Sequence, residues 1–198
     1  MKKPILILLT LLLTGVPLQD VSAQDSSTEI WIGTGIGTFP NLFDSFQGIA
    51  TSIGSLGNAS RESTSYQGNF YLKGKHRISN RLDIGGSYVF QPINSNLIRG
   101  NSIVGTQKTS WHSIMGVGDF YWMRRQSFGL FTGAGIGIAF ANETRRDNET
   151  REEAKGSMSS VALQLNLIGV QFGRQLSTSL TFGIGFEGLA SLGVGYRF

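Results

Sequence analysis

The amino-acid sequence predicts an all-β fold: a closed, antiparallel, up-and-down transmembrane β-barrel with eight strands. Three observations predict it. Large apolar side chains alternate with small or polar ones over long segments, 27 glycines accompany only 4 prolines, and long polar connections alternate with short ones. Alternation with a period of two gives a strand two different faces, as a wall between lipid and a lumen requires.

Residues 1–23 have the pattern of a secretory signal peptide. Two lysines precede an apolar run over 5–13, and 21–23 (Val-Ser-Ala) offer the small residues that a signal peptidase needs. The apolar run is much shorter than the roughly 20 residues that a helix needs to cross a bilayer. We expect cleavage after this segment, which leaves 24–198 as one outer-membrane β-barrel domain.

Composition excludes several classes of protein. Removing 23 of the 198 residues leaves 175, a length that suits one domain. The mature chain keeps 15 basic and 12 acidic residues, an excess too small to indicate a nucleic-acid partner. It has no cysteine, so packing and backbone pairing must stabilise it. No apolar run in it approaches the 18 residues of a helical span.

Eight strands are expected along the mature chain. They cover 29–38, 66–78, 82–92, 109–123, 128–141, 158–173, 178–187 and 190–198. Most reach the roughly 9–11 residues that a tilted membrane-crossing strand needs. No helical segment is left over.

The connections indicate the orientation. Residues 39–65, 93–108 and 142–157 form long connections rich in Gly, Ser, Asn and charge. The connections at 79–81, 124–127 and 174–177 are short. Outer-membrane barrels have long extracellular loops and short periplasmic turns. The fourth outer connection, near Gly188, is the exception because it is short.

Residue parity predicts how the strands pair. The expected cross-strand pairs next to the short turns are Arg77 with Asp83, Trp122 with Phe128, and Phe172 with Leu180. The sixth strand changes parity, which predicts a β-bulge near 167–168. The numerous glycines are expected to face the lumen, because a narrow barrel leaves little room there for side chains.

Outward-facing aromatic residues are expected at two levels, as in the aromatic girdles of outer-membrane barrels. The periplasmic set is Trp122, Phe128, Phe172, Tyr196 and Phe198. The extracellular set is Tyr66, Phe90, Phe140 and Phe186.

The last strand carries the most specific pattern, with Leu192, Val194, Tyr196 and the terminal Phe198 in alternation. With it, the whole of 24–198 resembles the small outer-membrane β-barrel families, the broad group that includes the eight-stranded barrels of OmpA and OmpX. The resemblance implies an outer-membrane location among lipid and lipopolysaccharide. It also implies that these four residues form the signal read by the barrel assembly machinery. It implies no activity.

Three patterns that suggest catalysis or cofactor binding have simpler explanations. The stretch 183–188 fits G-x-G-x-x-G, but only ten residues follow it, too few for the helix and acidic residue of a dinucleotide site. His112 lies beside Ser113 near the outer edge, but adjacent strand residues point to opposite faces, which argues against a catalytic pair. His76 has Ser79 nearby, but it lies beside a short turn on the periplasmic side, whereas an enzyme that acts on outer-leaflet lipid needs its site near the extracellular edge.

The charged segment 142–157 carries five acids and four bases, unlike a metal cage, which would concentrate carboxylates. We therefore expect no enzyme, no metal site and no cofactor.

Seven charged side chains are expected to face the lumen. They are Lys73, Lys75, Arg77, Asp83, Asp119, Glu187 and Arg197. Because unpaired buried charges are costly, the first interpretation is a salt-bridged core that fills the barrel. The alternative is a pore lined by charge.

The functional hypotheses follow this choice. The first is a non-enzymatic barrel with a structural or surface-binding role through the long extracellular loops. The second is a narrow porin-like channel for ions or small solutes, and the third is a lipid A-modifying enzyme. The sequence names no extracellular ligand.

Overall fold

The computed structural model describes residues 27–40, 60–66, 68–99, 102–147 and 153–198. The expected signal peptide over 1–23, and with it the start of the barrel domain, lies outside these residues, as does most of the predicted loop 39–65. Among the described residues, no helix has the length and apolar character needed to cross a membrane.

The described chain folds into antiparallel strands. They are β1 (Thr28–Ile36), β2 (Ser60–Tyr66), β3 (Asn69–Ser79), β4 (Leu82–Arg99), β5 (Ser102–Arg124), β6 (Phe128–Asp147), β7 (Glu153–Gly173), β8 (Leu176–Gly185) and β9 (Ala190–Arg197). β2 and β3 pair with successive parts of β4 and so share one position in the sheet.

The sheet closes into a ring. From β3 to β9 each strand pairs with the next along the chain, and β1 closes the ring by pairing with both β3 and β9. With β2 and β3 counted as one, this is an eight-stranded, up-and-down barrel. The predicted fold class is confirmed.

The two faces of the barrel differ as the alternation predicts. On β8, Leu180, Phe182 and Ile184 are exposed, whereas the residues between them are buried. The same exterior of large apolar side chains surrounds the whole described barrel. So large an exposed apolar surface requires lipid, and it forms the outer belt of a transmembrane barrel.

Two predicted loops are largely strand. β4 and β5 extend to Arg99 and from Ser102, and β6 and β7 extend to Asp147 and from Glu153. Most of 93–108 and 142–157 is therefore a pair of long hairpins, which corrects the predicted loop boundaries. Their polar side chains give no apolar alternation, but backbone pairing with a neighbouring strand needs none.

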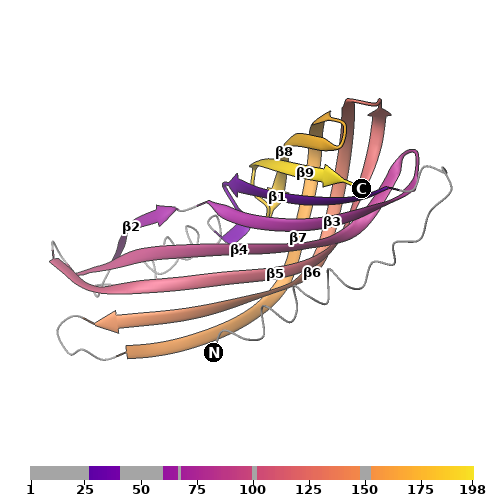
Figure 1. The fold of residues 1–198 in the computed structure, drawn as a ribbon. Coiled ribbons are helices and arrows are strands. Elements are labelled where there is room, and N and C mark those ends of the chain that lie inside the picture. Colours follow the sequence, from indigo (N-terminus) through magenta and orange to yellow (C-terminus); the bar gives the residue numbers. More distant parts are fainter. Residues whose placement is uncertain (1–26, 41–59, 67, 100–101, 148–152) are drawn as a thin grey trace.

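These extensions make the barrel rim uneven. Figure 1 shows β4 to β7 continuing well past the ends of β1, β8 and β9. We call the extended part, residues 93–99, 102–110, 142–147 and 153–162, the protruding sheet. It lies at the end of the long connections, which is the extracellular end in the expected orientation.

Two connections at this end turn inward and close the lumen. Thr38 and Pro40 after β1, and Phe186 and Glu187 after β8, are buried. Positive φ angles of 67° at Gly37, 145° at Gly185 and 109° at Gly188 allow the chain to bend there. We call these four buried residues the lumen cap. The prediction that Phe186 belongs to the outer aromatic level is therefore wrong.

The other aromatic residues lie as follows. Trp122, Phe172, Tyr196 and Phe198 are exposed near the short turns, and Phe140 is exposed nearer the extracellular end. Phe128 and Phe90 are half-buried. The side chain of Tyr66 lies outside the description.

The register agrees with parity in some places and departs from it in others. Arg77 lies opposite Asp83, and a register shift between Asn166 and Ile168 confirms the predicted bulge. Two predicted pairs are wrong by a short slip. Between β5 and β6, Met123 pairs with Leu130 and Trp122 is skipped at a bulge. Across the last turn, Phe172 pairs with Thr178, not Leu180.

Glycines occupy both faces of the wall, not the lumen alone. Gly33, Gly169 and Gly195 lie directly against the aromatic rings of Tyr71, Phe131 and Trp31, so that any Cβ there would collide with a ring. By contrast, Gly74, Gly86 and Gly116 are successive cross-strand partners that face outward. The lumen glycines make room for large interior side chains.

Candidate functional site: the charged lumen

The part of the lumen nearer the short turns holds an ionic cluster whose side chains come from four strands. The Nζ atom of Lys75 on β3 lies 2.9 Å from Oδ2 of Asp119 on β5 and 4.0 Å from Oε2 of Glu29 on β1. Glu29 in turn accepts from Arg197 on β9, with Nη2 at 2.6 Å from Oε1. Lys75, Asp119 and Glu29 are buried, so each charge is matched where water is scarce.

A second cluster lies nearer the cap. The Nζ atom of Lys73 lies 2.8 Å from Oε2 of Glu187, and the hydroxyl of Ser87 donates to Oε1 of Glu187 at 2.9 Å. The backbone N–H of Glu187 donates to Oε1 of Gln164 at 2.8 Å. The inward-turned connection is thus held by bonds to β3, β4 and β7.

Aromatic side chains fill the space around Lys75. Its Nζ atom lies 5.2 Å from the ring centre of Trp31, 5.8 Å from that of Tyr121 and 5.4 Å from that of Phe131. These contacts are cation–π interactions. The indole N–H of Trp31 also donates to Glu29 at 2.9 Å, so the rings and the ion pairs form one packed layer.

Little empty space remains between these groups. The cavity lined by Trp31, Tyr71, Lys73, Lys75 and their neighbours measures about 10 Å³. That is about the space of a single water. The described lumen therefore has the packing of a protein core.

The first hairpin brings Arg77 and Asp83 opposite each other but does not pair their charges. Oδ2 of Asp83 accepts from Nη2 of Arg124 on β5 at 2.6 Å. The guanidinium of Arg124 also stacks 3.6 Å from the ring centre of Tyr121. Nε of Arg77 is buried without a hydrogen-bond partner. The expected Arg77–Asp83 interaction is replaced by one with Arg124.

Two participants were missed by sequence reasoning. Glu29 shares its parity with Trp31 on β1, and this signal could have placed it in the lumen. Arg124 fell in the expected short connection 124–127, and its shared parity with the outward-facing Trp122 gave no signal that it faces the lumen. The bulge at Trp122 reverses the faces beyond it and turns Arg124 inward.

The residues that suggested catalysis lie apart. His112 is on the outer face, where its Nδ1 lies 2.7 Å from the hydroxyl of Tyr88 and its ring 5.0 Å from that of Phe90. Ser113 is fully buried on the inner face. His76 lies 3.1 Å from the hydroxyl of Thr28 near the short turns. Within the described ranges, no group of three or more His, Cys, Asp or Glu residues could hold a metal ion.

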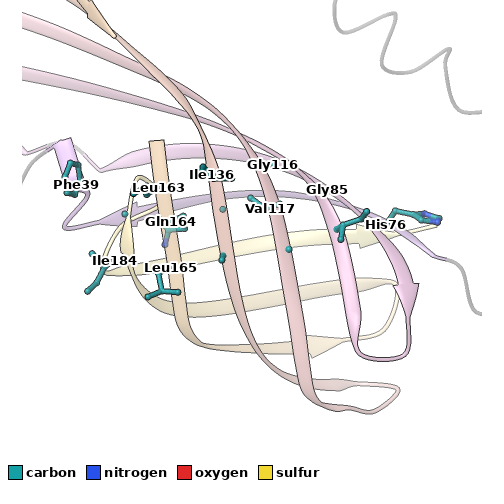
Figure 2. Close-up of a pocket in the computed structure, with 15 residues that line it drawn as sticks. Phe39, His76, Gly85, Gly116, Val117, Ile136, Leu163, Gln164, Leu165 and Ile184 are labelled. Carbon is teal, nitrogen blue, oxygen red and sulfur yellow. The ribbon is translucent and has the colours of Figure 1, made fainter. Parts of the chain in front are cut away.

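A second hollow, of about 1060 Å³, runs along the outer side of the wall between β4 and β8. Figure 2 shows its lining, with Phe39 and His76 at opposite ends and Gly116 and Ile136 between them. Ile136 and most other large side chains that line it are exposed, so the hollow faces lipid and is separate from the lumen.

The four residues of the C-terminal pattern lie on one face. Leu192, Val194, Tyr196 and Phe198 are all exposed on the lipid side of β9 or just after it. The rings of Tyr196 and Phe198 are 5.0 Å apart. Their role as an assembly signal stays a prediction.

Comparisons with known proteins find likeness in structure. No protein-family model matches the chain, and no curated protein matches its sequence. The structure of Ail, the attachment invasion locus protein of Yersinia pestis, in complex with the heparin analogue sucrose octasulfate is 14% identical, with 88% of this chain and 100% of Ail covered and a TM-score of 0.52.

Two other structures match with lower scores. Ail without the analogue is 15% identical, with 88% of this chain and 100% of that chain covered and a TM-score of 0.48. The N-terminal β-barrel domain of Pseudomonas aeruginosa OprF is 14% identical, with 88% and 98% covered and a TM-score of 0.42.

At 14% identity, the likeness to Ail at a TM-score of 0.52 shows the fold alone. The closed antiparallel ring and its apolar outer belt independently require a lipid bilayer, and barrels of this kind are those of outer membranes. The closed ring and the apolar belt together make this protein a small transmembrane β-barrel of the kind found in outer membranes.

Proposed function

We propose that the protein works at the cell surface as a non-enzymatic, non-conducting barrel that presents its protruding sheet to extracellular partners. The observation that carries the proposal is an open sheet edge. Residues 153–162 of β7 pair with β6 on one side, while β8 begins to pair on the other side only at Gln164. Among the described residues, no strand covers this edge.

An open edge is a binding surface for extended peptides. Its unpaired N–H and C=O groups can take up an additional strand, with main-chain hydrogen bonds supplying affinity. Ten residues span roughly 30 Å at about 3.3 Å per residue, which is long enough for specific pairing. The side chains of 154–160 are exposed on both faces, so a partner strand would meet no steric block.

The lumen supports a surface role over a transport role. The ion pairs of Lys73 and Lys75, the aromatic layer and the lumen cap occupy the path that a solute would take. Such a core stabilises the barrel and holds the protruding sheet in place. Ail, whose fold this chain shares, is described in complex with a heparin analogue, so ligand binding is compatible with such a fold.

The location carries further proposals. We expect export by the signal peptide over 1–23, insertion by the barrel assembly machinery, and lipid and lipopolysaccharide around the outer belt. The exposed apolar side chains of the belt support the lipid contacts.

The binding role is tested on the barrel in nanodiscs, with random 12-residue peptides displayed on phage as the probe. Successive N–H groups of β7 alternate between β6 and the open edge. Of the variants Ser157→Pro and Met158→Pro, one therefore removes an edge donor and the other disturbs pairing with β6. Full folded yield identifies the variant that has lost only the edge donor. We expect the enriched peptides to bind the wild type but not this variant. Unchanged binding to that variant would contradict edge recognition.

The non-conducting lumen is tested by single-channel recording in planar bilayers. We expect no conductance steps from the wild type. A porin with a water-filled lumen, recorded in the same bilayers, serves as the conducting control. Regular steps from the folded wild-type protein would establish the narrow channel instead.

A further inference from the structure

The periplasmic mouth of the barrel, opposite the protruding sheet, carries a concentration of arginine. A pocket of about 610 Å³ opens there, between the short turns and the ends of β3, β5 and β9. Its lining includes five arginines, namely Arg77, Arg124, Arg125, Arg174 and Arg197. None of the described residues that line it is acidic.

Only part of this charge is neutralised. Asp83 accepts from Arg124, and Glu29 accepts from Arg197. Within the described chain, the other three arginines have no ion pair. Arg77 lies within the electrostatic influence of Arg124 and Arg197, which the nearby carboxylates of Asp83 and Glu29 offset only in part, since each of these already holds another arginine. Like charges held this close are unfavourable unless an anion joins them.

Hydrogen-bond donors in this cluster lack acceptors. Nε of Arg77, and Nε and Nη1 of Arg124, are buried without a partner. A buried donor without an acceptor costs free energy, and a charged donor costs more. Asp83, which lies opposite Arg77, accepts from Arg124 through Oδ2, and its Oδ1 has no hydrogen-bond partner, so no hydrogen bond joins Asp83 to Arg77.

From this geometry we infer that the periplasmic mouth binds an oxyanion of the phosphate class. Guanidinium groups match phosphate oxygens through paired, charge-assisted hydrogen bonds. The three unmatched positive charges suit a multivalent anion, and the pocket has room for more than one phosphoryl group. The anion would bridge Arg77 and Arg174 across the mouth. The phosphate could come from the periplasm or from a lipid headgroup of the inner leaflet.

The test uses the full mature barrel in nanodiscs of zwitterionic lipid, with pyrophosphate as the soluble probe and calorimetry as the readout. We expect saturable binding that weakens with added salt. The double variant Arg77→Gln with Arg174→Gln should weaken it about tenfold or more, because two charge-assisted contacts are lost.

A matched control separates the pocket from overall charge. The double variant Arg145→Gln with Arg146→Gln removes the same charge from the exposed hairpin at the opposite end of the barrel. It should change binding by less than about twofold, since these charges lie beyond the screening length. Heat-modifiable gel migration verifies folding in each variant. Arg77→Lys, which keeps the charge without the planar fork, should bind with intermediate affinity.

A second arm identifies the source of the phosphate. The barrel is extracted from vesicles of mixed phosphatidylglycerol and phosphatidylcholine and weighed intact by native mass spectrometry. If the wild type retains phosphatidylglycerol and the Arg77/Arg174 variant does not, the site binds a lipid headgroup. Pyrophosphate binding without retained lipid would assign it to free phosphate.

Three results would overturn the inference: neither ligand bound by the wild type, equal weakening in the control variant, or polyglutamate bound more tightly than pyrophosphate. The site lies at the opposite end from the protruding sheet and is independent of the proposed surface role.

Discussion

Lys73 and Glu187 are joined across the lumen, with Nζ of the lysine 2.8 Å from Oε2 of the glutamate. Lys73 belongs to β3, and Glu187 belongs to the connection that turns inward after β8. Both side chains are buried. This ion pair therefore fastens the lumen cap to the barrel wall.

Replacing Glu187 with Gln should destabilise the barrel strongly. The variant leaves the ammonium of Lys73 buried without its counter-charge, a change that typically costs about 3–5 kcal/mol. Urea unfolding in lipid vesicles, followed by tryptophan fluorescence, measures the free energy of unfolding.

The matched control is Glu153→Gln. Glu153 and Lys155 form a pair at 3.8 Å whose side chains are 51% and 73% exposed. Removing an exposed pair should cost only about 0–1 kcal/mol. Equal losses in the two variants would mean that water reaches the Lys73–Glu187 pair.

A double-mutant cycle should find the partner of Asp83 on β5, not on β3. We expect Asp83→Ala and Arg124→Ala to be coupled by about 1–3 kcal/mol, because the pair is largely buried. The cycle of Asp83→Ala with Arg77→Ala should give a coupling close to zero. Stronger coupling to Arg77 than to Arg124 would show that the two arginines exchange places in the membrane.

The orientation of the barrel can be read on intact cells. An epitope inserted at Asn148, in the connection between β6 and β7, should be accessible to antibody. An epitope inserted at Asn80, in the turn between β3 and β4, should become accessible only after the outer membrane is permeabilised. Labelling at Asn80 alone would invert the orientation, so that the protruding sheet would face the periplasm and the arginine pocket the cell exterior.

Deleting Phe198 should impair assembly more than it impairs the finished barrel. The deletion removes an exposed interfacial aromatic and the last residue of the expected assembly signal. Folded yield in the membrane is measured by heat-modifiable migration.

The control for this deletion is Phe172→Ala, which removes an equally outward-facing aromatic at the same end of the barrel. Only the deletion should lower the rate of insertion. Similar insertion by both variants would leave Phe198 as one membrane anchor among several.

The fold was predictable because most of the chain obeys one rule. Where lipid lies on one side and packed side chains on the other, a period of two persists along the strand, and Leu180, Phe182 and Ile184 on β8 follow it without exception. The protruding sheet was not predictable, since its residues are mostly polar and its few apolar side chains do not alternate. Its strands are specified by their neighbours' backbones.

The details of the lumen were harder to predict for a different reason. A single bulged residue reverses which face of the sheet each later side chain of the strand occupies. The bulge at Trp122 on β5 therefore turns Arg124 inward, which the alternation of the sequence does not reveal. Phe186 follows an alternating run but lies beyond Gly185, where a φ of 145° ends the strand and directs the chain inward. The choice of Arg124 over Arg77 by Asp83 depends on side-chain geometry, which register alone does not fix.

The uneven rim gives the protein a front and a back within the plane of the membrane. On the side of β8, β9 and β1 the wall ends low, and on the side of β4 to β7 it continues as the protruding sheet (Figure 1). A molecule approaching along the membrane surface from the low side meets the open edge of β7, whereas one approaching from the other side meets the outer face of the sheet. Rotation about the membrane normal therefore determines which neighbours this protein can engage, so its contacts in a crowded membrane are directional.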